Sequence, residues 1–236
     1  MLKLRAGIAV LTLPGALVLG SCGGGGSPSG PSAVPSPAPT AAPTARYSVT
    51  FQATWSAQSH PTDFPGNPHF SPLIGGTHSS AVRLWTAGGI ASDGIEAMAE
   101  LGRTSPFDLE VEAAIAAGTA EHVLRGPNIA VSPGSAALEF EISTSRPLVT
   151  LVSMIAPSPD WFVGVHDLSL LENGDWVRER VVTLEPYDAG TGDGVTYQSP
   201  DRDAQPRRPI REIDGFPFDA QGRVAPMGTF TFRRLQ

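Results

Sequence analysis

Three aspartates stand in two loop-like segments whose composition suits a metal ion. Asp160 precedes the tryptophan of the PSPDW segment, and Asp188 and Asp193 belong to PYDAGTGDG. Calcium takes about six to eight oxygen ligands, usually carboxylates together with backbone carbonyls and water. Prolines stiffen the first loop, and glycines let the second turn its carbonyls inward. Converging carboxylates repel unless a cation or a proton compensates. The residues predict an oxygen-ligand metal site, although the spacing alone is also typical of two solvent-exposed acidic turns.

Histidines offer a second possible metal site, which the spacing disfavours. His60, His69 and His78 are nine residues apart and could bind zinc together with Asp63. This spacing places them on no common helix face, and the neighbouring prolines and aromatic residues favour a packed structural loop.

Catalytic strings are missing from the chain. Neither G-x-S-x-G nor HExxH occurs. Ser153, Asp160 and His166 suggest a triad, but they lie in or beside one predicted strand region, where successive side chains point to opposite faces. We therefore expect no enzyme activity.

The N-terminus has the features of an export signal. Lys3 and Arg5 precede a short apolar run from Ala6 to Leu19. A membrane span would need about 20 apolar residues. Cys22, the only cysteine, follows Leu-Gly-Ser, which resembles the lipobox of bacterial lipoproteins. The resemblance implies lipidation of Cys22 and, with Gly23 after it, outer-membrane sorting in a Gram-negative host. The alternative is an ordinary signal peptide with an incidental thiol.

Composition divides the rest of the chain into a tether and a domain. Residues 23–45 contain only Gly, Ser, Pro, Ala, Thr and Val, which predicts a disordered linker. Residues 46–236 are long enough for one domain with a substantial core. The net charge of −7 makes nucleic acid an unexpected partner. Arg207, Arg208 and Arg211 cluster, and we expect them to form a solvated surface.

Hydrophobic periodicity predicts an all-β fold. Apolar and polar residues alternate over 49–55, 107–113, 138–142 and 230–232, as in half-buried strands. Segments 148–155 and 161–165 are apolar at both parities, which predicts strands covered on both faces. One short helix is expected from Asp93 to Gly102, because Asp93 and Glu96 have capping-box spacing. Many strands with one helix and no βαβ rhythm indicate an antiparallel β-sandwich.

Long strings identify the domain by resemblance. YSVTFQATWS, HPTDFPGNPHFSPLIGGTHSS, LWTAGGIASDGIEAMAELG, PLVTLVSMIAPSPDWFVGV and PYDAGTGDG occur in the same order as in the spondin domain, the N-terminal module of F-spondins. The similarity runs from about residue 47 to 213. It implies a β-sandwich similar to the calcium-dependent, phospholipid-binding C-two type.

The resemblance also implies a calcium ion held by aspartates of the two loops. Asp160 matches the PSPDW aspartate and Asp188 the first acid of the PYDAGT motif. F-spondins read DAGTDSG, whereas this chain has Gly192 at the second acid and Asp193 one position later. Either the loop shifts to deliver Asp193, or the ion has one carboxylate fewer.

The expected function is that of a non-catalytic adhesion or matrix-binding module, exported and lipid-anchored in the cell envelope, with an unknown protein or glycan ligand. One alternative is a carbohydrate-binding module that uses its four tryptophans, which would need two exposed, coplanar rings. A less favoured alternative is a calcium-dependent hydrolase, which would need a concave pocket with convergent titratable groups.

Overall fold

Antiparallel strands and two helices make up the computed structural model, which describes residues 41–200, 202–220 and 222–236. The export signal, Cys22 and most of the predicted linker lie outside these residues. The strands are β1 Thr44–Ala53, β2 His69–Phe70, β3 Ile74–His78, β4 Ala120–Arg125, β5 Gly134–Ser143, β6 Leu148–Ala156, β7 Trp161–Ser169, β8 Leu171–Glu172, β9 Asp175–Trp176, β10 Glu179–Leu184, β11 Tyr187–Asp188, β12 Arg211–Glu212, β13 Asp219–Ala220, β14 Arg223–Val224 and β15 Gly228–Arg234. The helices are α1 Asp93–Leu101 and α2 Phe107–Ala116.

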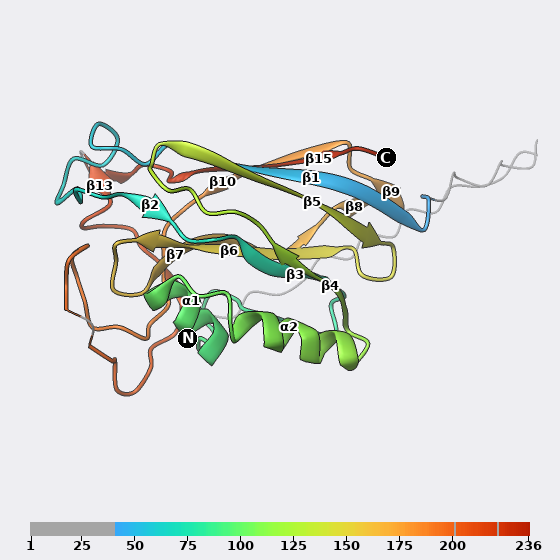
Figure 1. The fold of residues 1–236 in the computed structure, drawn as a ribbon, viewed down its shortest axis with the longest axis horizontal. Helices are drawn as coiled ribbons and strands as arrows, with labels where there is room; N and C mark the ends of the chain where they lie inside the picture. Colours follow the sequence, from blue (N-terminus) through green and yellow to red (C-terminus); the bar gives the residue numbers. More distant parts are fainter. Residues whose placement is uncertain (1–40, 201, 221) are drawn as a thin grey trace, which may run out of the picture. The chain divides into compact units, whose positions relative to one another are not determined.

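Two sheets face each other, and the helices cover the outer side of one of them (Figure 1). The first sheet has the order β10-β15-β1-β5, and the second has the order β12-β11-β7-β6-β3-β4, with β2 beside β6. Hairpins β8-β9 and β13-β14 form two separate two-stranded sheets. The predicted antiparallel β-sandwich is confirmed. β1 begins at Thr44, two residues before the expected start of the domain.

The core between the sheets follows from the alternation in β1. Tyr47, Val49, Phe51 and Ala53 are fully buried, while the residues between them are exposed or half-buried. Phe51 meets Phe230 of β15 edge to face, with ring centroids 5.1 Å apart. Burial of a Val or Phe side chain such as Val49 or Phe51 stabilises the fold by roughly 1.5–3 kcal/mol.

A second core lies between the second sheet and the helices. In β6, Leu151 belongs to the core between the sheets, whereas Val152 and Met154 pack with residues of the helices. β6 and β7 therefore have apolar residues at both parities, as predicted for strands covered on two faces. No helix among the described residues is long and apolar enough to cross a membrane.

The expected helix is confirmed as α1. Its N-cap is Ser92, one residue before the predicted Asp93, and Ser92 Oγ accepts a hydrogen bond from Ile95 N at 3.2 Å. Gly102 ends the helix in the left-handed region, with φ of 64°, a conformation that favours glycine.

The strand predicted at 107–113 is wrong, because this segment forms α2. Its buried residues are Phe107, Val111 and Ala114, which are spaced by four and three as on one face of a helix. Leu109, which a strand would have buried, is 56% exposed. The alternation of apolar and acidic residues suited both structures, and packing against β3 and β4 selected the helix.

Candidate metal centre

Asp160 is held at the start of β7 by the loop that precedes the strand. Ser158 Oγ accepts a hydrogen bond from Trp161 N at 3.1 Å, which fixes the turn around the aspartate. Asp160 is fully buried. Its Oδ2 accepts hydrogen bonds from Thr191 N at 2.8 Å and Gly192 N at 2.9 Å. Its Oδ1 is buried and has no hydrogen-bond partner among the described residues, so one oxygen of a buried carboxylate is left for a ligand.

Asp188 lies beside this carboxylate because β11 pairs with β7, with Asp188 opposite Trp161. The side chain is almost fully buried. Its Oδ1 accepts a hydrogen bond from Gly190 N at 2.8 Å, and its Oδ2 forms an ion pair with Arg211 Nη2 at 2.6 Å. The next residue, Ala189, donates from its backbone N to Asp160 O at 3.0 Å. Pairing of β11 with β7 thus brings Asp188 close to Asp160.

The charged form of Asp160 is disfavoured by its surroundings. Burial raises the pKa of Asp160 from 3.8 to about 6, and the nearby Asp188 adds to the increase. The hydrogen bonds from Gly192 and Thr191 lower this pKa but do not outweigh the other two effects. A pair of this kind is stabilised by a proton or a cation.

Asp193 points away from this pair. Its side chain is 41% exposed and forms an ion pair with Arg208, with 2.5 Å between Oδ1 and Nη1. Arg208 Nη2 also donates to Gly192 O at 2.6 Å. Across the described ranges, no three or more His, Cys, Asp or Glu side chains gather as a metal-binding group. Asp193 is therefore not delivered to Asp160 and Asp188 in this structure.

Gly192, by contrast, lies against Asp160. A Cβ at this position would stand 3.3 Å from Asp160 Cγ, so a side chain here would start at the buried carboxylate. Because residue 192 is a glycine, this position next to the candidate site supplies no side-chain oxygen to a metal ion.

The three histidines that were considered as zinc ligands form hydrogen bonds with different local partners. His60 binds Ala225 O through Nε2 at 2.8 Å, His69 binds Asn67 O at 2.8 Å, and His78 binds Thr150 Oγ1 at 2.8 Å. Each histidine has local partners, which agrees with packed structural roles.

The suggested triad is not assembled. Ser153 donates to Ser71 O at 2.7 Å, and His166 lies beside Asp167 and the ring of Trp85. Asp160 instead bonds to the amides of Thr191 and Gly192.

Sequence reasoning missed the arginines of this region. Arg211 pairs with Asp188, Arg208 with Asp193, and Arg207 with Asp93 and Glu96 of α1. The three arginines are exposed or half-buried, as expected of a solvated surface. They also form ion pairs, of which those of Arg207 join the 188–211 segment to helix α1. Their spacing in the sequence gave no signal, because their partners lie 15 to 114 positions away.

Comparisons with known proteins show the family of the chain. The chain matches the Spondin_N family model over residues 45–222 and belongs to this family. It is 38% identical to Spondin-1 of Rattus norvegicus over 171 residues, which are 67% of this chain and 20% of that protein. It is 35% identical to Spondin-2 of Homo sapiens over 186 residues, which are 77% of this chain and 55% of that protein. The match thus covers about a fifth of Spondin-1 and just over half of Spondin-2.

The raised pKa of Asp160 predicts a pH-dependent stability in the presence of a chelator. The folded protein holds this proton more tightly than the unfolded chain, so the free energy of unfolding falls as the pH rises from about 4 to about 6. The contribution is of the order of 2–3 kcal/mol. Urea unfolding at pH 4.5 and 7.5 should show a smaller fall for Asp160→Asn than for wild type. Asp193→Asn is the control, because Asp193 is exposed, and it should keep the wild-type fall. An equal fall in all three proteins would contradict the assignment.

Proposed function

We propose that this chain is a non-catalytic binding module that acts outside the cell in adhesion to an extracellular-matrix-type ligand. Membership of the Spondin_N family over residues 45–222 carries the proposal. Ser153, Asp160 and His166 each interact with residues outside the suggested triad, which also argues against the hydrolase alternative.

The carbohydrate alternative loses its main support. Trp55, Trp161 and Trp176 lie in the core between the sheets, and Trp85 lies in the core under the helices. All four are at most 6% exposed, so their rings offer no stacking platform. A glycan ligand would have to use another surface.

Calcium is the proposed cofactor of the module. Asp160 and Asp188 would hold it, because they form a buried carboxylate pair in which Asp160 Oδ1 has no hydrogen-bond partner among the described residues. When bound, the ion would neutralise the pair and join the loop before β7 to β11. Arg211 already neutralises part of Asp188, and Asp193 is engaged by Arg208. Two carboxylates with a competing arginine favour weak binding, since affinity follows ligand charge.

The third part of the proposal is the envelope anchor. Cys22 after Leu-Gly-Ser, followed by residues 23–45 of linker composition, would hold the domain at the outer membrane by a lipid and give it reach from the surface.

Restoring a carboxylate beside Asp160 tests the calcium site. Gly192→Asp places a carboxyl group next to the pair and should tighten calcium binding about tenfold or more, because ligand charge sets the affinity. Titration calorimetry, together with melting at millimolar calcium, measures this effect, since a ligand of the folded state raises the melting temperature. Asp193→Asn should bind calcium like wild type. Calcium that neither releases heat nor raises the melting temperature in any variant would remove the site.

Binding to matrix tests the function itself. The purified full-length protein should bind saturably to surfaces coated with extracellular matrix, and removing calcium with a chelator should weaken the binding. Protease or glycosidase treatment of the coating distinguishes a protein from a glycan ligand. Binding no greater than that of heat-denatured protein would sink the proposal, and release of matrix fragments by the protein would favour the hydrolase alternative.

Fractionation of cells tests the anchor. Wild type should appear in the membrane fraction and Cys22→Ser in the soluble fraction, because the variant has no thiol to acylate. Ser21→Ala is a suitable control, since it keeps a small residue before the cysteine. A Cys22→Ser protein that stays in the membrane fraction would contradict lipidation.

A further inference from the structure

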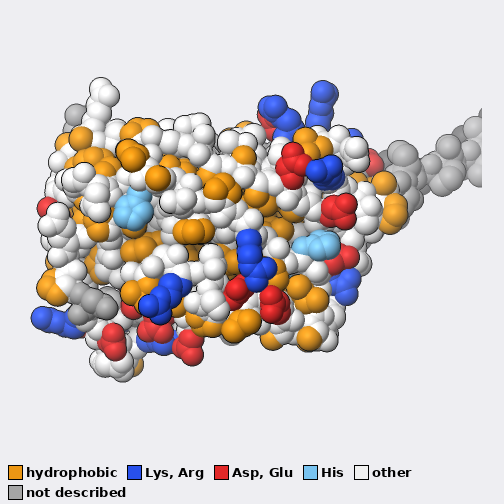
Figure 2. All heavy atoms as spheres, viewed as in Figure 1, with side chains coloured by type: hydrophobic (Ala, Val, Ile, Leu, Met, Phe, Trp, Pro, Cys, Tyr) orange, Lys and Arg blue, Asp and Glu red, His pale blue; other side chains and the backbone are white. Residues whose placement is uncertain are grey.

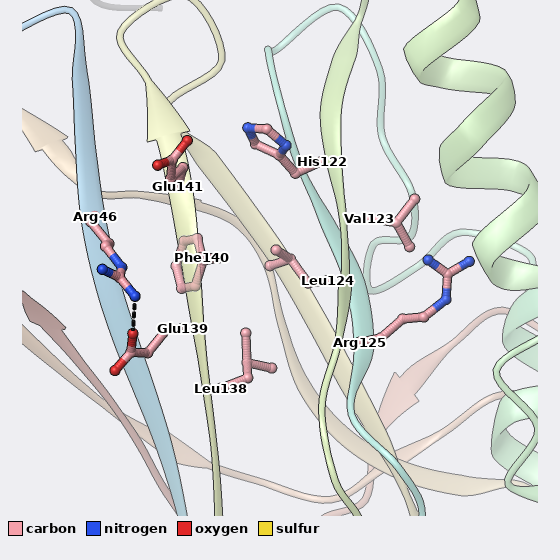
Figure 3. A pocket seen from close by; sticks show the side chains of 9 residues that line it. All are labelled: Arg46, His122, Val123, Leu124, Arg125, Leu138, Glu139, Phe140 and Glu141. Atoms are coloured by element: carbon pink, nitrogen blue, oxygen red, sulfur yellow. Dashed lines mark hydrogen bonds and ion pairs between the residues drawn. The ribbon is translucent and has the colours of Figure 1, made fainter.

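A groove of about 470 Å³ lies between the last strands of the two sheets, β4 and β5 (Figure 3). We call it the edge slot. It is lined by residues 122–125 of β4, residues 138–141 of β5, and Arg46 of β1. In the part of the chain that the structure describes, each of these two strands pairs with one neighbour, β4 with β3 and β5 with β1. An edge strand with an unpaired side can accept a further strand from another chain.

The backbone of β5 turns a regular set of polar groups toward this free side. Arg46 N donates to Gln236 O and Leu235 N donates to Arg46 O, so even-numbered residues of β1 bond to β15 and odd-numbered ones to β5. Tyr47 stands opposite Phe140, which puts the N–H and C=O of Phe140 toward β1. The N–H and C=O of Glu139 and Glu141 therefore point to the open edge.

Side chains of the slot alternate in character. Leu138 and Phe140 point to the interior side, and Leu124 of β4 closes the floor. Glu139 and Glu141, between and beside them, are exposed. An extended segment with apolar and basic residues in alternation would match this pattern residue by residue, because side chains of a strand alternate with a period of two.

The lining holds two arginines and two glutamates, and two carboxylates of α2, Asp108 and Glu112, adjoin it through Arg125. Arg46 is paired with Glu139 at 2.6 Å, and Arg125 is shared between Asp108 at 3.1 Å and Glu112 at 3.2 Å. These two arginines thus have three carboxylate partners, and Glu141 adds a fourth carboxylate to the rim. Figure 2 shows acidic and basic side chains around an apolar strip on this side of the molecule.

We propose that the edge slot binds an extended segment of a protein partner, with basic residues at alternate positions, which adds as a strand to β5. This inference rests on the proposed binding function and names the surface and the class of partner. A second copy of this chain fits less well, because antiparallel pairing of two β5 strands would bring their glutamates together. The chain's own residues 23–45 fit less well too, because their prolines lack the N–H that a strand donates.

A synthetic peptide tests the slot without matrix or calcium. The probe is a fluorescent acetyl-Thr-Lys-Val-Lys-Val-Lys-Thr-amide, and its anisotropy is followed as purified full-length protein is added in chelator at low salt. We expect saturable binding that weakens at least tenfold with Ala137→Pro. Ala137 is exposed and stands opposite Thr50, so its N–H lies on the free edge and no bond to β1 is lost.

The opposite edge of the same sheet provides the matched control. Val181 of β10 is exposed, and Met227 N donates to Leu184 O, so even-numbered residues of β10 bond to β15 and the N–H of Val181 is free. Val181→Pro should bind the peptide like wild type. Glu141→Gln should weaken binding severalfold and reduce its dependence on salt, because one of the charges that attract the peptide is removed.

Several results would overturn the proposal. They are the absence of saturable binding, equal affinity of wild type and Ala137→Pro, and a dimer of wild type that Ala137→Pro dissociates, which would make a second copy the occupant. If Ala137→Pro does not fold, a peptide N-methylated at alternate residues replaces it, and undiminished binding of that peptide overturns the inference. A failure here leaves matrix binding to be measured separately, because the peptide assay contains no matrix.

Discussion

Burial of β6 and β7 on both faces is the constraint on which the rest of the structure depends. One set of their side chains forms the core between the sheets, and the other forms the core under α1 and α2. Because two layers meet at these strands, the second sheet is fixed by packing on both sides. Among the described residues no helix covers the outer face of the first sheet (Figure 1), where Arg46 and Gln52 of β1 are exposed.

This rigid pair of strands also sets the place of the acidic site. Asp160 stands at the first turn into β7, and Asp188 is brought to it by pairing of β11 with the same strand. The cost of burying two carboxylates side by side appears in the raised pKa of Asp160. The amides of Thr191 and Gly192 and the guanidinium of Arg211 offset part of this cost. In a site of this kind, the ordering of the two loops depends on the cation or proton that the carboxylates hold.

The open edges have the opposite character. β4 and β5 end their sheets without a further partner strand among residues 41–200, 202–220 and 222–236. The groove between them combines free backbone groups, an apolar floor and a charged rim that includes Glu139 and Glu141. Proteins usually protect such edges with charge, and Glu139 and Glu141 serve that purpose here. The same carboxylates that discourage self-association select a basic partner, so protection and recognition come from one pattern.

The sequence by itself determined the sandwich class, the two-sided burial of residues 148–155 and 161–165, and helix α1. These depend on local periodicity, on caps and on long family strings, which are all properties of neighbouring residues. Tertiary structure decided the rest. It made 107–113 a helix, because packing on β3 and β4 outweighed an ambiguous alternation, and it turned Asp193 to Arg208 instead of to the buried pair. It also brought β4 and β5 together as adjoining free edges, since pairing between distant segments is set by the global fold and leaves no local trace.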